Sequence, residues 1–318
     1  MQLKIEVLKV LEEERGHDIS GQALAARFGV SRNAIWKAVR ALRAEGYKIV
    51  AGQNKGYRLS EENDMLSAVG IANAITHQVK GLSVYLHRSI DSTNEEAKRL
   101  ITAGKGGSAL IVAEEQTAGR GRRGRQFFSP ALTGIYMTFS FPTHMKLVDA
   151  LGITTATAVA VFLAIRDLTG IETEIKWVND LYLNGKKICG ILTEAISDFE
   201  SGCAQNILIG IGINYQTKDF PRELRDTAAS LAPSGVSRNE MVARIIDRLL
   251  DILDGEVDYL SLYRAHSMVL GKDIVYERDG VKTEARAVEI DEDGGLVVAH
   301  ADGSRSTLTS GEISLRLR

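Results

Sequence analysis

The sequence predicts an α+β protein with a helical N-terminal region, a central mixed sheet covered by helices and a small C-terminal β-barrel. Three patterns predict this class. Apolar residues recur at helical spacing before residue 45, short apolar runs alternate with helical stretches in the middle, and closely spaced short strands follow residue 272. Hairpin signals between the central strands favour this class over a doubly wound parallel sheet.

The composition fits a folded soluble chain of roughly two domains. It has 318 residues, 44% of them hydrophobic, and a formal charge of -2. No stretch offers the roughly 20 uninterrupted apolar residues of a membrane span, and the charged Lys4, Glu6 and Lys9 stand where a signal peptide is apolar. We therefore expect a cytoplasmic protein that binds no membrane. Cys189 and Cys203 lack the paired spacing of metal ligands, so we expect reduced thiols.

The first 60 residues predict three helices followed by a β-hairpin. The first helix ends in the acidic residues 12–14, the second begins at the N-cap Ser20 and ends at Gly29, and the third begins at Ser31. A stretch with two glycines, 47–59, follows. This order is typical of a winged helix-turn-helix, whose last helix enters the major groove of DNA while the wing reaches phosphate.

The third helix has an apolar and a basic face. The apolar face consists of Ile35, Ala38, Val39 and Leu42. The candidate DNA-binding residues of the other face and the wing are Ser31, Arg32, Asn33, Trp36, Lys37, Arg40, Lys55 and Arg58. Between residues 21 and 60, Glu45 is the single acid among eight basic side chains, an asymmetry typical of nucleic-acid faces. The alternative is a helical protein-interaction module with solvated charges.

The polar segment 61–64 predicts a boundary, so we expect domains at 1–63, 64–268 and 269–318. Expected central strands lie at 82–87, 109–113, 135–141, 174–183, 186–192 and 207–215, and helices begin near 92 and cover 147–168 and 238–263. The pair Asn184-Gly185 is a strong hairpin signal. The C-terminal barrel would use strands at 272–276, 284–290, 296–300, 306–308 and 313–317.

A loop of alternating glycines and arginines, Thr117 to Arg125, lies between two apolar strands. Glycine permits close backbone approach and arginine supplies a planar charged fork, so the alternation predicts a cradle for a carboxylate or phosphate. The alternative is a flexible basic loop or a nucleic-acid-binding tail. The position between strands favours a site.

Other polar residues cluster around the hairpin at 174–187. Lys187 has apolar neighbours in its strand, and because an unpaired buried lysine is costly, we expect it to face an anion. Asn179 and Asp180 either join this site or merely end a strand. Ser92 has capping-box spacing to Glu95, which predicts helix capping, ligand binding or both.

Several site types lack a signal in the sequence. The six histidines are scattered, which supports neither a catalytic triad nor a zinc site. A GxGxxG in a βαβ setting and a GxxxxGK[ST] motif are both missing, which argues against dinucleotide and P-loop binding.

Together these motifs resemble the bacterial bifunctional biotin-protein ligases and biotin-operon repressors. The similarity covers essentially the whole chain, and the combination of the Gly/Arg loop with the Lys-Trp-x-Asn-Asp hairpin is highly specific to that family. The matching motifs are Gly119 to Gly124, Lys176 to Leu183, Asp91 to Asn94, Ile209 to Asn214 and Gly311 to Leu315. The resemblance implies a catalytic domain of the biotin–lipoyl ligase type, related to class II synthetases, and an SH3-like barrel.

The resemblance implies a reaction in two steps with ATP and biotin as substrates and Mg²⁺ as cofactor. Biotin carboxylate attacks the α-phosphate of ATP to give biotinyl-5'-AMP and pyrophosphate, and a lysine of a biotin carboxyl carrier protein then accepts the biotinyl group. The adenylate would also promote a homodimer that binds operator DNA and represses biotin biosynthesis genes.

Site residues follow from the same resemblance. Catalytic roles would belong to Arg122, Lys187 and Asp180. Biotin contacts would come from Ser92, Thr93, Asn94, Gln116, Arg120, Gly121, Arg122 and Lys187. Contacts to ATP or the adenylate would come from Lys176, Asn179, Asp180, Asn214 and Phe127, whereas the metal ligands are not indicated. Two positions depart from the family: Val178 replaces a usual proline, and Phe127 stands where a tryptophan often stacks near adenine.

Three alternatives stay open at this point. One is a DNA-binding biotin sensor that no longer transfers biotin. Another is a lipoate- or octanoyl-transferring enzyme, which the arginine-rich loop disfavours. The third is a helix-turn-helix that binds no DNA.

Overall fold

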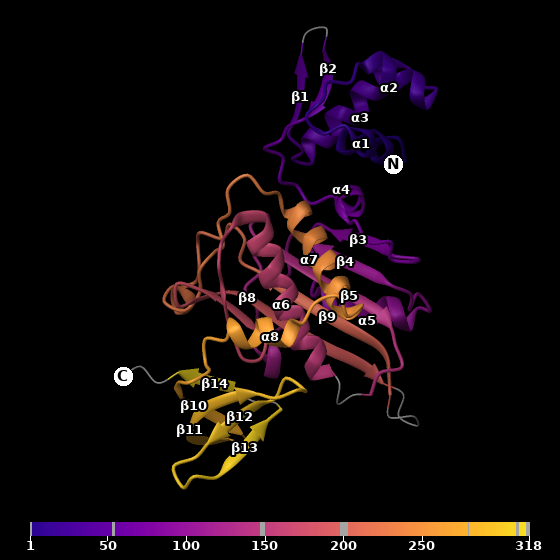
Figure 1. Cartoon of the computed structure of the whole chain (residues 1–318). Coiled ribbons are helices and arrows are strands. Elements are labelled where there is room, and N and C mark those ends of the chain that lie inside the picture. Colours follow the sequence, from indigo (N-terminus) through magenta and orange to yellow (C-terminus); the bar gives the residue numbers. More distant parts are fainter. Residues whose placement is uncertain are drawn as a thin grey trace. The chain divides into compact units, whose positions relative to one another are not determined.

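The computed structural model describes residues 2–52, 55–146, 150–197, 203–278, 280–309 and 312–315 (Figure 1). The chain forms two compact units. Unit 1 contains residues 1–78 and 234–244, and unit 2 contains residues 79–233 and 245–318. A short segment from late in the sequence thus completes the N-terminal unit.

Unit 1 contains the predicted helices and hairpin. They are α1 (Gln2–Glu13), α2 (Gly21–Phe28), α3 (Arg32–Ala44), β1 (Ile49–Gly52), β2 (Gly56–Leu59) and, beyond the predicted set, α4 (Ala68–Ala74). The hydroxyl groups of Ser20 and Ser31 accept hydrogen bonds from the N–H of Ala23 and Ala34, as N-caps do. Gly29 ends α2 in the left-handed conformation at φ 63°. The four predicted apolar residues of α3 are buried in the core of this unit.

The start of α7 (Arg238–Leu253) belongs to unit 1 because it binds the segment after β2. Arg238 is 2% exposed, and its backbone N–H donates to Asp64 Oδ1 at 2.7 Å while its Nε donates to Oδ2 at 3.1 Å. Asn239 Oδ1 accepts from the N–H of Ser67 at 3.0 Å. The carboxylate of Asp64 therefore compensates the charge of the buried Arg238.

Unit 2 is built on a seven-stranded mixed sheet in the order β3-β4-β5-β9-β8-β7-β6. Its strands are β3 (Ser83–His87), β4 (Ala109–Ala113), β5 (Ile135–Pro142), β6 (Glu174–Lys176), β7 (Asp180–Leu183), β8 (Lys186–Ser197) and β9 (Ala204–Ile213). The β3–β4 pair is parallel and the other neighbours are antiparallel. The preference for hairpin connections over a doubly wound sheet is therefore confirmed.

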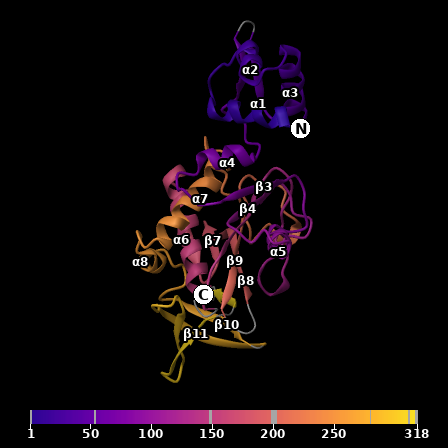
Figure 2. The same ribbon diagram turned by 90° about the vertical axis from the view of Figure 1, so that its right-hand side faces the viewer.

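Helices cover both faces of this sheet. In Figure 2, α6 (Ala150–Thr169) and α8 (Tyr259–Ala265) lie on one side and α5 (Thr93–Thr102) on the other. The segment Leu151–Thr169 is long and apolar enough to cross a membrane, but 67% of the apolar 18-residue stretch within it is buried inside the fold. This is the burial of a core helix that packs on a sheet.

The C-terminal residues form a five-stranded antiparallel sheet in the order β13-β12-β11-β10-β14. Its strands are β10 (Asp273–Arg278), β11 (Val281–Ile290), β12 (Leu296–Ala299), β13 (Arg305–Leu308) and β14 (Glu312–Leu315). The indole Nε1 of Trp177 donates to the carbonyl of Gly294 at 3.0 Å, which ties the β11–β12 turn to the turn between β6 and β7.

The structure corrects three local predictions. The helical stretch 238–263 is two helices, because the chain turns after Leu253 and Gly255 takes φ 80°. The strand 174–183 is interrupted after Lys176 by a turn that leads into β7. Ser92 occupies the N-cap position of α5, but its side chain makes no cap hydrogen bond, so the predicted capping box does not form.

Candidate functional site

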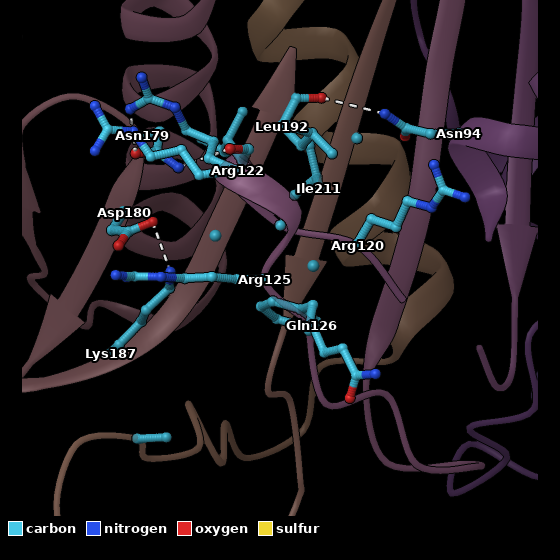
Figure 3. A pocket seen from close by; sticks show the side chains of 18 of the residues that line it. Asn94, Arg120, Arg122, Arg125, Gln126, Asn179, Asp180, Lys187, Leu192 and Ile211 are labelled. Carbon is cyan, nitrogen blue, oxygen red and sulfur yellow. Dashed lines mark hydrogen bonds and ion pairs between the residues drawn. The ribbon is translucent and has the colours of Figure 1, made fainter. Parts of the chain in front are cut away.

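A cavity of about 400 Å³ lies in unit 2 between the start of α5, the Gly/Arg loop and the ends of β6 to β9 (Figure 3). The predicted ligand-contacting residues that line it are Ser92, Thr93, Asn94, Gln116, Arg120, Gly121, Arg122, Phe127, Lys176, Asn179, Asp180 and Lys187. These residues come from four separate stretches of sequence, so the fold gathers them at one place.

Asn214 is the predicted contact that does not line the cavity. It follows β9, is 5% exposed, and its backbone N–H donates to the carbonyl of Ile188 at 2.8 Å. Its carbonyl accepts from the N–H of Leu231 at 2.8 Å. The backbone of Asn214 therefore holds neighbouring segments together beside the site.

Three of the residues that line the cavity from β8 and β9 are glycines. A Cβ atom on Gly210 would lie 2.3 Å from Asn94 Oδ1, and one on Gly212 would lie 2.5 Å from the ring of Phe127. A Cβ atom on Gly190, the register partner of Gly212, would lie 3.1 Å from Lys187 Nζ. Any larger residue would push these side chains out of place. The sequence interpretation gave no role to these glycines, although their alternation within a buried strand was a usable signal.

Lys187 and Asp180 form an ion pair on neighbouring strands, with Nζ 2.7 Å from Oδ1. Their side chains are 32% and 20% exposed, so the ammonium is partly shielded from water while it faces the cavity. The adjacent Cys189 is fully buried, and burial raises the pKa of its thiol well above the ordinary value. The site therefore offers cationic stabilisation, and Cys189 cannot act as a thiolate nucleophile.

The Gly/Arg loop is folded over the cavity. The N–H of Gly121 donates to the carbonyl of Arg125 at 2.7 Å, and a short 3-10 turn, Arg122–Gly124, lies between them. The guanidinium of Arg122 donates to Asn179 Oδ1 at 3.2 Å, whereas that of Arg120 pairs with Glu95 Oε1 at 3.0 Å. Arg122 thus connects the loop to the turn between β6 and β7, and Arg120 connects it to the first turn of α5; Figure 3 shows the two side chains pointing in different directions.

The turn between β6 and β7 holds Asn179 in place. Asn179 Nδ2 donates to the carbonyl of Ile191 at 2.8 Å. Val178, at the position where the family usually has proline, is buried, and its carbonyl accepts from the hydroxyl of Tyr263 at 3.1 Å. Phe127, the second departure, places its ring against Gly212 and lines the cavity. The aromatic face expected at this position is therefore present.

The start of α5 forms the polar end of the cavity. The N–H of Thr93 donates to Gln116 Oε1 at 2.9 Å, and the Thr93 hydroxyl donates to the same oxygen at 3.1 Å. Ser92 is only 3% exposed and lines the cavity. Across the described ranges, the structure contains no group of three or more His, Cys, Asp or Glu side chains that could hold a metal ion.

The candidate DNA-binding face lies in unit 1. Residues 31–33, 36, 37 and 40 are exposed, and Trp36 is 48% exposed with the guanidinium of Arg40 5.4 Å from its ring centroid. Lys55 is exposed at the wing, whereas Arg58 is partly engaged, since its Nε lies 3.9 Å from Asp18 Oδ1. An exposed aromatic ring among cations suits a nucleic-acid surface.

Comparison with known protein families assigns all three parts of the chain. A model described as the biotin/lipoate A/B protein ligase family matches residues 86–214. A helix-turn-helix domain model matches residues 4–58, and a model of the biotin protein ligase C-terminal domain matches residues 269–316. These matches occur in the same order as the three predicted parts.

Relatives that match over nearly the whole chain, and a solved structure, indicate the same family. The chain is 32% identical to the bifunctional ligase/repressor BirA of Bacillus subtilis, with 98% of each chain covered. It is 32% identical to the protein of the same name from Escherichia coli, with 93% of this chain and 92% of the relative covered. The biotin protein ligase from Aquifex aeolicus in complex with biotin and ATP matches with a TM-score of 0.60 and 27% identity over 75% of this chain and 99% of that one.

Proposed function

Because the chain belongs to the family of bifunctional biotin-protein ligases and repressors, we propose that it joins biotin to a carrier protein at the expense of ATP and represses transcription through its winged helix. The observation that carries this proposal is the cavity in which the Gly/Arg loop meets the Lys187–Asp180 ion pair. Cations on two sides of one cavity suit a reaction between a carboxylate and a phosphate.

The first step joins two anions. A carboxylate oxygen of biotin attacks the α-phosphorus of ATP, the bond to the β-phosphate oxygen breaks, and pyrophosphate leaves. Lys187 and Arg122 reduce the repulsion between carboxylate and phosphate and stabilise the charge that develops on the phosphate oxygens. Asp180 orients the ammonium of Lys187 across their 2.7 Å contact.

The second step transfers the acyl group. The neutral amine of an acceptor lysine attacks the acyl carbon of biotinyl-5'-AMP, AMP leaves, and the amide nitrogen loses a proton. Between the steps the mixed anhydride must be kept from water. The folded Gly/Arg loop, which Arg122 connects to Asn179, is the element that excludes water in this proposal.

The individual residue roles are also proposals. Biotin would meet Ser92, Thr93, Asn94, Gln116, Arg120, Gly121, Arg122 and Lys187, and the nucleotide would meet Lys176, Asn179, Asp180, Asn214 and Phe127. Asp180 is also the carboxylate in the cavity that could face Mg²⁺, since this ion commonly binds one carboxylate together with substrate phosphates. Bound in that way, Mg²⁺ would neutralise charge on the triphosphate.

The cellular setting completes the proposal. The acceptor is a biotin carboxyl carrier protein, the DNA partner is the operator of biotin biosynthesis genes, and the repressor is a cytoplasmic homodimer promoted by biotinyl-5'-AMP. The proposed domain limits for these activities are 1–63, 64–268 and 269–318, although residues 64–78 and 234–244 pack within unit 1. The family name supports the ligase and repressor activities, and the helix-turn-helix match supports the DNA partner.

Labelling of an acceptor tests the ligase directly. The full chain incubated with biotin, ATP and a biotin acceptor domain should add one biotin to one acceptor lysine, measured by intact mass, and omission of ATP should abolish the product. A protein that binds biotin without labelling would be a sensor. Lipoate that displaces biotin in adenylate formation at equal concentration would favour a lipoate ligase instead.

Neutralising the exposed face of α3 should weaken DNA binding. For the triple variant Arg32→Ala, Lys37→Ala and Arg40→Ala, we expect operator affinity to fall at least about tenfold and the slope of log affinity against log salt to shrink by roughly 3, because three phosphate contacts are lost. Fluorescence anisotropy at several salt concentrations measures both. The exposed Lys9 of α1 provides the control, since Lys9→Ala should change neither value. An unchanged salt slope in the triple variant would place the DNA contact elsewhere.

A further inference from the structure

The turn between β6 and β7, residues 177–179, is held by two hydrogen bonds from outside the central sheet. The hydroxyl of Tyr263 on α8 donates to the carbonyl of Val178 at 3.1 Å. The indole Nε1 of Trp177 donates to the carbonyl of Gly294 in the β11–β12 turn at 3.0 Å. The side chains of Tyr263, Trp177 and Val178 are all buried, so water has little access to either contact. We call these two hydrogen bonds the turn clamp.

Asn179, the last residue of this turn, provides an attachment point for the Gly/Arg loop. Its Nδ2 donates to the carbonyl of Ile191 at 2.8 Å, and its own carbonyl accepts from the N–H of Ile191 at 2.9 Å. Because the NH₂ group faces β8, the amide oxygen faces the loop, where it accepts from Arg122 at 3.2 Å. Figure 3 shows the side chain of Arg122 reaching Asn179. The position of this one oxygen therefore defines where Arg122 docks.

The backbone that leads into Asn179 is held by Tyr263. Valine does not fix its own φ angle as a proline at position 178 would, so the turn needs a constraint from outside. The carbonyl of Val178 and the N–H of Asn179 belong to the same rigid peptide unit, so any shift of the carbonyl also moves Asn179. Burial raises the pKa of Tyr263 well above its ordinary value, so the phenol keeps its proton and remains a donor.

Tyr263 does not line the cavity, so an effect on a bound ligand has to pass through residues that do. We propose that Tyr263 is a positioning residue for closure of the Gly/Arg loop: its hydrogen bond to Val178 holds Asn179 where Arg122 can dock while the adenylate is bound. This inference rests on the proposed function. It gives α8, which lies outside the predicted site motifs, a role in retention of the intermediate.

The variant Tyr263→Phe tests this role. Phenylalanine keeps the ring and removes the hydroxyl, which leaves the buried carbonyl of Val178 without this donor. We expect biotinyl-5'-AMP to dissociate about three to ten times faster, because the turn relaxes and displaces Asn179. The rate is measured by chasing radiolabelled biotinyl-5'-AMP with an excess of the unlabelled adenylate. The dissociation constant of biotin alone should stay within about twofold of the parent value, since its proposed contacts at the start of α5 do not depend on the turn.

A double-mutant cycle with Arg122 tests the route of the effect. Arg122→Ala removes the group that docks on Asn179, so a displaced Asn179 has no further consequence for the loop. The double variant Tyr263→Phe, Arg122→Ala should therefore release the adenylate within about twofold of the rate of Arg122→Ala alone. If the two effects multiply instead, Tyr263 acts on the site by another route, and the inference fails.

Tyr47→Phe is the matched control. Tyr47 is also a buried tyrosine whose hydroxyl donates to a backbone carbonyl, that of Leu66 in unit 1, at 3.3 Å. Its truncation removes a hydrogen bond of the same type without touching the turn clamp, so the adenylate should dissociate at the parental rate. Equal acceleration in Tyr47→Phe and Tyr263→Phe would indicate general loosening of the protein and would contradict a positioning role.

Two further outcomes would overturn the inference. One is a parental dissociation rate in Tyr263→Phe, and the other is a biotin dissociation constant that rises by the same factor as the adenylate rate, since the whole cavity would then depend on Tyr263. Should Tyr263→Phe fail to fold, Trp177→Phe breaks the other hydrogen bond of the turn clamp. The same acceleration, absent in the Arg122→Ala background, is then expected, and a parental rate would contradict the clamp. If the parent protein binds no biotinyl-5'-AMP, the proposed function itself fails, independently of Tyr263.

Discussion

Replacing Lys187 by methionine should lower the rate of adenylate formation by about 10² to 10³, the loss typical of a fixed donor that stabilises developing negative charge. Methionine keeps most of the length and apolar volume of the lysine stem, so the loss reports the ammonium. The measurement is biotin-dependent exchange of pyrophosphate into ATP. The reason is geometric, because Lys187 is partly buried, faces the cavity and is oriented by Asp180.

The adjacent residue supplies the control. Lys186 has the same charge, but its Nζ donates to the carbonyl of Arg225 on an exposed surface, and it does not line the cavity. Lys186→Met should leave the exchange rate within about twofold, since exposed polar contacts contribute little. Exchange in Lys187→Met within threefold of the parent would remove Lys187 from the reaction.

Loss of the ammonium also leaves the Asp180 carboxylate without its ion-pair partner inside the cavity. A destabilised protein could lose activity for that reason alone, since breaking a shielded pair costs free energy. The double variant Lys187→Met, Asp180→Asn removes both charges and separates the effects. We expect its melting temperature to recover while the exchange rate stays low, because the ammonium that assists the attack on phosphate is still missing.

Local signals in the sequence predicted much of the fold. Ser20, Gly29 and Ser31 define helix ends through atoms within a few residues, and the predicted limits hold. Asn184 and Gly185 take φ 51° and 75°, as a two-residue hairpin turn requires. These features depend on neighbours in the chain, so the spacing of residue types was sufficient to find them.

Features that depend on distant partners were missed. The capping box at Ser92 is absent, and the N–H of Ser92 donates instead to Asp91, whose carboxylate is paired with Arg99. The roles of Gly190 and Gly212 depend on their register across two strands. The hydrogen bond from Asn94, which lines the cavity, to Glu194 was not predicted, because the two residues are 100 positions apart in the sequence. Residue type alone could not reveal these contacts.

Arg122→Ala should lose adenylate retention and ligand-promoted DNA binding together. Arg122 connects the Gly/Arg loop to Asn179, and it also borders a second cavity of about 940 Å³ in unit 2. Truncation removes the connection and a side chain that stands beside both cavities. We expect biotinyl-5'-AMP to dissociate about ten to a hundred times faster, in line with the loss of one charge-assisted hydrogen bond. Rapid mixing with excess unlabelled biotin measures the dissociation rate.

The coupling to DNA follows if the loop orders when the adenylate binds and so contributes to the dimer surface of the proposed repressor. Sedimentation and operator binding, each with and without biotinyl-5'-AMP, should then lose their ligand dependence in Arg122→Ala. The exposed Arg286 of β11 lines neither cavity, so Arg286→Ala should keep both responses. A variant at Arg122 that releases the adenylate quickly, yet still dimerises on DNA when the ligand is saturating, would separate the two roles. In that case the loop would only retain biotinyl-5'-AMP, and another element would couple the bound adenylate to dimerisation on DNA.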